Sequence, residues 1–397
     1  MAAESCLAIG LISGTSADGI DACIVKIACK DDGTFELEVV GFDTYAYPEG
    51  LKQKIFDISE RGSVQEICLY NVLLGKLFAE AAKRVCVECG VALESVLVIG
   101  SHGQTIHHIP GLQSLFGHQV AATLQIGDPS VIANECGVTS VGDFRVADMS
   151  VGGQGAPLVP YLDKILLKKF HQDTGRHGAL LNIGGISNIS IYMPNEDKMI
   201  GFDCGPGNMV VDGLMEELFG QPYDDGGEHA KRGKVCQDLL QQFLKDDYYS
   251  KPPPKSTGRE VYGKVFIKLF LEAGTKYNLS ADDFVATATE LTAETVRVNY
   301  YLHVRPLLLR EQDTIRAVLF VSGGGVHNDH LMRRLKELLV DCDIESSMNF
   351  NIDPNAKEAV CFALLAYQTL KGVATNIPDV TGASRPVVLG KICPVVT

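Results

Sequence analysis

Apolar runs separated by glycine-rich turns predict alternating strands and helices in the first half of the chain. The runs Cys6 to Ser13 and Ile20 to Ala28, with glycines between them, predict two buried strands joined as a hairpin. From Val64 to Cys89 apolar residues recur at helical spacing, which predicts a long helix with one buried stripe. Val96 to Gly100 predicts another strand, and Asp128 before a proline is typical of a helix start.

The second half of the chain repeats this order of elements. The runs Ala179 to Ile183 and Ile189 to Met193 flank a glycine pair, as the two opening strands flank a glycine turn. Ala317 to Val321 predicts a strand that leads into three glycines, and Asn355 to Leu370 predicts the last helix. Two units of strand, glycine turn and strand in separate halves favour a duplicated α/β lobe.

The length of the chain also predicts two lobes, because 397 residues exceed what one hydrophobic core usually serves. We place the N-terminal lobe at residues 1–155, with part of the helical region 355–397, and the C-terminal lobe at residues 156–354. Thr257 and Glu260 have the spacing of a capping box that would begin a helix, and Asn208 is expected to cap another.

Composition and charge narrow the classes of function. Acidic residues outnumber basic ones by 49 to 35 and no cluster rich in Lys or Arg appears, which argues against nucleic acid as a partner. The N-terminus has neither a basic start nor a cleavage site, and no apolar run reaches the roughly 20 residues that cross a membrane. We therefore expect a soluble cytoplasmic protein without a membrane partner, in which the 12 cysteines stay reduced. A homodimer is left open.

The turn between the first two strands carries groups that can bind an anion. Its backbone N–H groups and hydroxyls can converge on a phosphate, although the order of a Walker A loop is missing. The same role is expected of the later glycine turns, so that three turns could line one cleft. Taken alone, the first of these turns could equally be an ordinary hairpin turn. The candidate nucleotide-binding residues are Gly14, Thr15, Ser16, Ala17, Asp18, Gly19, Ile20, Asp21, Gly184, Gly185, Gly323, Gly324 and Gly325.

Asp203 lies at the end of a predicted strand, before a glycine-rich bend and a helix. Helix N–H groups favour the charged form of a nearby carboxylate, so Asp203 is a candidate general base. A structural role, in which Asp203 only braces the turn, is equally compatible with its position.

Polar residues that follow a predicted strand are candidates for binding a small substrate. His102 and Gln104 come directly after such a strand, where the ligands of α/β proteins usually lie. Asp143, Arg145 and Asp148 can together grip sugar hydroxyls or a carboxylate, but they could equally form a structural ion pair. No metal ligand is assigned.

A series of stretches, in order along nearly the whole chain, carries a resemblance to a known family. They are SGTSADGID at 13–21, SHGQTIHH at 101–108, LQIGDPSVIA at 124–133, GGQGAPLVP at 152–160, LNIGGISNI at 181–189, GFDCGPGN at 201–208, PPKSTGRE at 253–260, GGG at 323–325, KEA at 357–359 and DVTGA at 379–383. From about Leu7 to Ile392 the chain resembles the anhydro-N-acetylmuramic acid kinases.

This resemblance implies an α/β fold of two actin-like (ribonuclease H-like) lobes with a nucleotide cleft between them, which holds ATP and Mg²⁺. It implies that Asp203 deprotonates a water for attack on the anomeric carbon of anhydro-N-acetylmuramic acid. The 1,6-anhydro ring would open and the 6-oxygen would accept the γ-phosphoryl group, giving N-acetylmuramic acid 6-phosphate in cell-wall sugar recycling. From its place in the KEA segment, Glu358 is expected to contact the sugar.

One departure from the family pattern leaves the substrate open. Many bacterial members have the segment DFR-x-RD, whereas Ala147 stands in place of the second arginine in this chain. Loss of a cation fits a sugar without the lactyl carboxylate, so a kinase of levoglucosan (1,6-anhydroglucose) is the main alternative. The stretches GGQGAPLVP and DVTGA favour the muramic acid substrate. A sensor that kept the lobes but lost turnover is a further alternative, against which the intact Asp203 argues.

Overall fold

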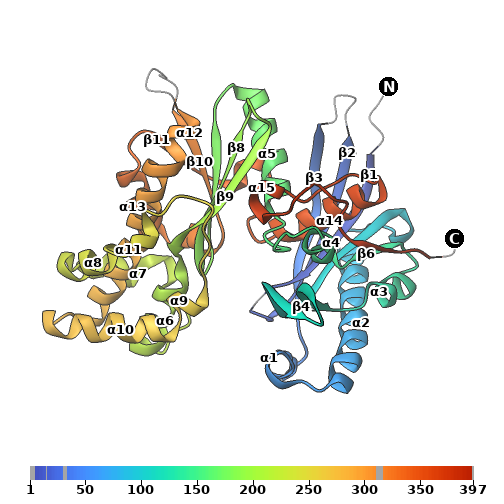
Figure 1. Cartoon of the computed structure of the whole chain (residues 1–397), viewed down its shortest axis with the longest axis horizontal. Helices are drawn as coiled ribbons and strands as arrows, with labels where there is room; N and C mark the ends of the chain where they lie inside the picture. Colours follow the sequence, from blue (N-terminus) through green and yellow to red (C-terminus); the bar gives the residue numbers. More distant parts are fainter. Residues whose placement is uncertain (1–4, 15, 30–33, 310–315, 396–397) are drawn as a thin grey trace. The chain divides into compact units, whose positions relative to one another are not determined.

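The computed structural model describes residues 5–14, 16–29, 34–309 and 316–395. The chain divides into two compact units, unit 1 with Met1–Ile165 and Asn351–Thr397, and unit 2 with Leu166–Phe350. Each unit is built around one β-sheet flanked by helices (Figure 1). The first division falls inside one helix, α5 (Pro160–Thr174). The lobe boundaries at 155/156 and 354/355 remain a prediction.

The sheet of unit 1 has seven strands. Its order is β12-β6-β4-β1-β2-β3, and β5 pairs with β4. β1 is antiparallel to β2 and parallel to β4, β2 is antiparallel to β3, and β4 is parallel to β6. The bounds are β1 Ser5–Ser13, β2 Gly19–Cys29, β3 Phe35–Ala46, β4 Val96–Leu115, β5 His118–Ile126, β6 Ser140–Gly142 and β12 Lys391–Cys393.

The sheet of unit 2 repeats the order and directions of strands β6-β4-β1-β2-β3 of unit 1. Its order is β11-β10-β7-β8-β9, in which β7 is antiparallel to β8 and parallel to β10, β8 is antiparallel to β9, and β10 is parallel to β11. The bounds are β7 Gly178–Ile183, β8 Ile186–Met193, β9 Lys198–Pro206, β10 Ala317–Ser322 and β11 Cys342–Ser346. Both units thus follow one pattern of strand order and direction, that of actin-like, ribonuclease H-like lobes.

The helices close separate hydrophobic cores in the two units. In unit 1 they are α1 Leu51–Arg61, α2 Val64–Glu88, α3 Pro129–Cys136, α4 Phe144–Ser150, α14 Lys357–Leu370 and α15 Pro378–Thr381. In unit 2 they are α6 Asn208–Phe219, α7 Glu228–Arg232, α8 Gln237–Leu244, α9 Arg259–Tyr262, α10 Lys264–Gly274, α11 Ala281–Asn299, α12 Arg305–Leu308 and α13 Asp329–Leu338. None of the helices in the described ranges is long and apolar enough to cross a membrane.

Two paired glycines bring α14 directly onto the sheet of unit 1. Gly10 on β1 and Gly100 on β4 are register partners. A Cβ built on Gly10 would lie 1.7 Å from the carbonyl oxygen of Ala359, and one on Gly100 would lie 2.1 Å from that of Phe362. Only glycine permits this approach, because any side chain would meet helix backbone. The glycine pair therefore fixes the height of α14, drawn in red in Figure 1, above β1 and β4.

Several predicted elements are confirmed, and two helix starts were predicted wrongly. The opening hairpin, its counterpart in unit 2, the long helix α2 and the helix predicted at 355–370 (α14) are all present, although α15 follows α14 and is the last helix. Asp128 caps α3 by accepting from two backbone N–H groups. Thr257 and Glu260 form no capping box, since α9 begins at Arg259 after Gly258 without a side-chain cap. Asn208 is the first residue of α6 rather than its cap.

Candidate functional site

Gln104 is hydrogen-bonded to the glycine turn that joins β1 and β2 in unit 1. The backbone N–H of Ala17 donates to the carbonyl oxygen of Gly14 at 3.1 Å, which closes the turn between β1 and β2. The Gln104 side-chain amide donates to the same carbonyl at 3.3 Å and accepts from the Ser13 hydroxyl at 2.6 Å. Gln104 therefore braces the turn. A Cβ built on Gly14 meets nothing within 4 Å, so the other side of this residue is open.

The remaining residues of this turn differ in what they offer a ligand. The Asp18 carboxylate pairs with Lys52, and the hydrogen bond from Lys52 is the main cause that lowers its pKa. Asp21 accepts from the Thr44 hydroxyl at 2.6 Å, and burial raises the pKa of Asp21. Ala17 and Ile20 are buried in the core, so only their backbone can face a ligand. Ser16 is exposed, Gly19 is in β2, and Thr15 lies outside the described residues.

His102 and Arg145 form one hydrogen-bonded pair in unit 1. Nε–H of Arg145 donates to Nε2 of His102 at 3.0 Å, and Nδ1–H of His102 donates to the carbonyl oxygen of Gly103 at 3.0 Å. These bonds require the neutral imidazole, and burial together with Arg145 lowers the pKa of His102 to about 3. His102 therefore serves as a fixed acceptor that orients Arg145. The Phe362 ring, 4.8 Å from the imidazole, holds it in place.

Glu358 stands in the first turn of α14, beside this pair. A carboxylate in the first turn is favoured by the helix dipole. Burial, and next the negative charge of Asp21, raise the pKa of Glu358, while Arg145 and Lys357 oppose the rise. The Glu358 side chain nevertheless keeps contact with solvent. Lys357 is committed elsewhere, because its ammonium lies 2.7 Å from the Asp163 carboxylate and both side chains are buried.

The two aspartates of the 143–148 segment have other partners. The Asp143 carboxylate pairs with Lys391 at 2.7 Å, and this ion pair is partly exposed. Asp148 is completely buried and accepts three hydrogen bonds, from Gly155, Asn376 and Thr381. Among the described hydrogen bonds, neither aspartate joins the group formed by His102 and Arg145, so Asp148 is a structural residue here.

In unit 2 the two predicted glycine turns lie side by side around Ile183. A Cβ on Gly323 would lie 2.7 Å from the Ile183 carbonyl oxygen, and one on Gly325 would lie 2.5 Å from the Ile183 side chain. The N–H groups of Asn208 and Met209 donate to the carbonyl oxygens of Gly184 and Gly185 at 2.7 and 3.2 Å, so the start of α6 is tied to the first turn.

Two glycines of these turns leave open backbone where a phosphate could approach. A Cβ on Gly184 would have no atom nearer than 3.7 Å, and one on Gly324 would meet only the Asn208 amide nitrogen at 3.4 Å. The same test gives close contacts at Gly323 and Gly325, where glycine is required for packing. In these turns, Gly184 and Gly324 therefore leave the backbone accessible to a ligand, whereas Gly323 and Gly325 allow close packing against neighbouring residues.

Asp203 lies on β9 and is held through one of its two carboxylate oxygens. Oδ2 accepts from the Thr257 backbone N–H at 2.9 Å and from the Ser256 hydroxyl at 3.0 Å. No donor bonds Oδ1 within the described part of the chain. Burial raises the pKa of Asp203, and the hydrogen bonds from Thr257 and Ser256 counteract that rise. The carboxylate is thus oriented, partly buried and free at one oxygen.

Lys255 is hydrogen-bonded to the backbone of Asp203, a contact that the sequence did not predict. Its carbonyl oxygen accepts from the Asp203 N–H at 3.2 Å, and its ammonium donates to the carbonyl oxygens of Tyr248 and Tyr249 at 3.0 and 3.1 Å. The Tyr248 hydroxyl donates to the Asp203 carbonyl at 3.0 Å. Burial lowers the pKa of Lys255 to about 8. The signal in the sequence was the PPKSTGRE stretch, which supplies every donor to the carboxylate.

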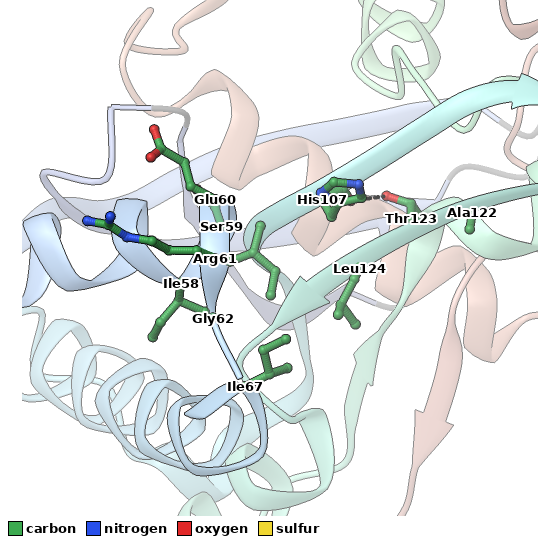
Figure 2. A pocket seen from close by; sticks show the side chains of 11 residues that line it. Ile58, Ser59, Glu60, Arg61, Gly62, Ile67, His107, Ala122, Thr123 and Leu124 are labelled. Carbon is green, nitrogen blue, oxygen red and sulfur yellow. Dashed lines mark hydrogen bonds between the residues drawn. The ribbon is translucent and has the colours of Figure 1, made fainter. Parts of the chain in front are cut away.

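A pocket of about 310 Å³ in unit 1 is separate from these residues. It lies between the end of α1 and the β4–β5 hairpin (Figure 2), and none of the predicted site residues lines it. Its wall is largely apolar, with Ile58, Ile67 and Leu124 beside the more polar Arg61. Within residues 5–14, 16–29, 34–309 and 316–395, no cluster of three or more His, Cys, Asp or Glu side chains could hold a metal ion.

Comparison with known proteins identifies the family. The family model described as anhydro-N-acetylmuramic acid kinase matches residues 6–395. The chain belongs to this family. It is 40% identical over 395 residues to the Anhydro-N-acetylmuramic acid kinase of Caldanaerobacter subterraneus subsp. tengcongensis, covering 98% of this chain and 97% of the relative. It is 40% identical over 389 residues to that of Salinibacter ruber, covering 97% and 95%.

Among solved structures, this anhydro-N-acetylmuramic acid kinase family member is similar to component A of (R)-2-hydroxyglutaryl-CoA dehydratase from Acidaminococcus fermentans. The TM-score is 0.45 at 12% identity, covering 92% of this chain and 99% of the other. The strand order within each unit, rather than this superposition, defines the fold. Family membership makes the chain a kinase of the sugar-kinase type and places the intact Asp203 stretch in an enzyme family.

Proposed function

We propose that this chain is an ATP-dependent kinase that opens the 1,6-anhydro ring of anhydro-N-acetylmuramic acid by hydrolysis and phosphorylates the 6-oxygen. The product is N-acetylmuramic acid 6-phosphate. The proposal is carried by one observation: in a chain that matches the family over residues 6–395, the Asp203 carboxylate has one oxygen held by two donors and the other free of any donor among the described residues. The free Oδ1 can accept a proton while the two donors hold the carboxylate in place through Oδ2.

Asp203 would act as the general base. Oδ1 accepts a proton from a water whose oxygen attacks the anomeric carbon, and the bond from that carbon to the bridging oxygen breaks. Burial makes the carboxylate more basic, while Ser256 and Thr257 keep it ionised and fix its direction. The 6-oxygen that is released takes the γ-phosphoryl group of ATP, for which positioning and charge neutralisation matter more than a protein nucleophile.

Backbone groups of the glycine turns would bind the phosphates of ATP. The accessible positions are Gly14, Gly184 and Gly324, where a Cβ would meet no atom closer than 3.4 Å. Asp18 and Asp21 are the carboxylates of this turn that would hold Mg²⁺, which takes hard oxygen ligands and few protein groups when it also binds phosphates. When bound, Mg²⁺ neutralises charge on the phosphate oxygens.

Arg145, His102 and Glu358 would bind the sugar. Arg145 has five N–H donors, of which the bonds to His102 and Gly155 use two, so three remain for substrate oxygens. A guanidinium held at two points loses little further freedom on binding. Glu358 supplies an acceptor for a sugar hydroxyl within electrostatic reach of Arg145. Gln104 and Asp143 would affect sugar binding less directly. Gln104 would act by holding the turn after β1, and Asp143 by its place at the start of α4, which carries Arg145.

The test is an assay of the purified protein with Mg-ATP and each of two anhydro sugars. With anhydro-N-acetylmuramic acid we expect ADP release and a product heavier than the substrate by one water and one phosphoryl group. Faster turnover of levoglucosan would assign the alternative substrate, and ATP binding without turnover of either sugar would indicate a sensor. The cytoplasmic location and the homodimer remain predictions, which fractionation and light scattering would check.

A further inference from the structure

Asp148 is a buried carboxylate for which the proposed chemistry has no direct use. It lies in α4 and has no exposed surface. Its hydrogen-bond donors are neutral: the Asn376 amide at 2.8 Å and the Thr381 hydroxyl at 2.7 Å on Oδ1, and the Gly155 N–H at 2.8 Å on Oδ2. Burying a charge is costly unless each lone pair is bonded, so this arrangement needs a reason.

The glycine-rich loop after α4 is shaped around this carboxylate. A Cβ on Gly153 would lie 2.1 Å from Oδ2 of Asp148, so glycine is required there. Gly155 has φ +70, a conformation that glycine adopts without strain, and this turns its N–H onto the carboxylate. The contact at Gly153 and the hydrogen bond from Gly155 therefore fix the backbone of this loop beside Asp148.

The same loop is also hydrogen-bonded to Arg145 through Gly155. The carbonyl oxygen of Gly155 accepts from Nη1 of Arg145 at 2.8 Å, while Nε of that guanidinium donates to His102. Gly155 is thus fixed on one side by Asp148 and on the other by Arg145. Displacement of the Gly155 carbonyl would release one of the two bonds that orient the guanidinium.

The C-terminal segment 376–384 is hydrogen-bonded both to Asp148 and to the loop after α4. Besides the bonds of Asn376 and Thr381 to Asp148, the Gln154 N–H donates to the carbonyl oxygen of Thr381 at 2.8 Å. The Ser384 N–H and hydroxyl donate to the Val151 carbonyl at 2.9 and 2.8 Å. Two segments more than 200 residues apart in the chain are therefore joined at Asp148, four residues from the start of α4.

We propose that Asp148 is a positioning residue for the sugar site, which holds Arg145 in its binding orientation through Gly155 and is itself fixed by Asn376 and Thr381. The inference rests on the proposed function, because it takes Arg145 to bind the substrate. It also explains why a charged carboxylate is used: an ionised acceptor strengthens three hydrogen bonds at once. A neutral side chain of the same shape would leave at least one donor unpaired.

The test compares Asp148→Asn and the milder Thr381→Val with the control Ser384→Ala, which alters the same segment without touching Asp148. We expect the KM for the anhydro sugar to rise on the order of tenfold in Asp148→Asn, by less in Thr381→Val, and not in Ser384→Ala. The KM for ATP should not change in any variant. In the double variant Arg145→Lys with Asp148→Asn, the KM for the sugar should rise little beyond that of Arg145→Lys alone, because both changes act on the same guanidinium.

A readout that does not need turnover is the solvent exchange of the Arg145 Nε–H, followed by NMR in the protein without sugar. We expect faster exchange in Asp148→Asn and Thr381→Val and wild-type exchange in Ser384→Ala. If the wild-type protein turns over neither sugar but exchange accelerates, the proposed function fails and the positioning role stands. Unchanged exchange in Thr381→Val and Asp148→Asn, or losses that add fully to those of Arg145→Lys, would overturn the role of Asp148.

Discussion

Removing the hydroxyl of Ser256 should move the pH profile of the enzyme without removing the proposed base, Asp203. In Ser256→Ala the Asp203 carboxylate keeps the Thr257 N–H on Oδ2 and loses the 3.0 Å hydrogen bond from Ser256. That bond lowers the pKa of Asp203 against the effect of burial. Because the base works only when ionised, losing the bond raises its pKa and shifts the acid limb of the profile to higher pH.

The size of this shift follows from the exposure of Ser256. A hydrogen bond to an ionised group contributes about 1.5–3 kcal/mol. Since Ser256 is exposed, water can replace part of the interaction, which leaves about 1 kcal/mol. At about 1.36 kcal/mol per pKa unit, the acid limb of kcat/KM should move up by about 0.5–1 pH unit. On the alkaline side, where Asp203 is ionised in both proteins, the rates should agree.

The assay is kcat/KM for the anhydro sugar at saturating ATP over a range of pH. Ser250→Ala is a matched control, because Ser250 is an exposed serine whose hydroxyl donates to the Asp247 carbonyl and not to Asp203. The reasoning is refuted if the acid limb of Ser256→Ala coincides with that of the wild-type protein and of Ser250→Ala. In that case another group governs the ionisation.

Three further predictions address the base, the sugar site and the fold. Asp203→Asn should abolish turnover, yet titration calorimetry should find ATP affinity within a few fold of wild type; retained activity would contradict the base assignment. Glu358→Gln should raise the KM for the sugar or lower kcat, and unchanged steady-state constants would refute the contact. Gly100→Ala, whose Cβ would lie 2.1 Å from helix backbone, should lose about 1–3 kcal/mol of unfolding free energy in denaturant titration. Gly111→Ala, with open space around its Cβ, should unfold like wild type.

The fold was largely predictable because its strands are marked by local signals. Apolar runs bounded by glycine turns locate β1, β2, β7, β8 and β10, and the repeat of strand, turn and strand predicts two similar lobes. The sequence could not give the length of β4, which was expected to end at Gly100 but continues to Leu115 as an exposed hairpin with β5. From His107 on, the extension is largely exposed, so it has no buried apolar stripe that the sequence could reveal.

The candidate site was predictable in its residues but not in their partners. The position of Asp203 at a strand end suggested a base, but the donors to its carboxylate lie more than 50 residues further along the chain. Thr257 was assigned to a capping box, a local interaction that the structure replaces with a long-range bond from its N–H to Asp203. Local spacing favours the cap, and only tertiary contact decides against it.

Asp203 and Asp148 illustrate why carboxylates in similar stretches take different roles. Asp203 lies near the end of β9 and Asp148 lies within α4, both close to glycines, and the sequence makes both candidate site residues. Asp148 is fully buried with both oxygens bonded, so no lone pair faces a proton or a substrate. Within the part of the chain that the structure describes, Asp203 has two donors on one oxygen and none on the other, and burial raises its pKa. In these two residues, the number of bonded oxygens distinguishes the proposed base from the brace. That quantity depends on donors brought from distant parts of the chain, which is why spacing within the sequence does not contain it.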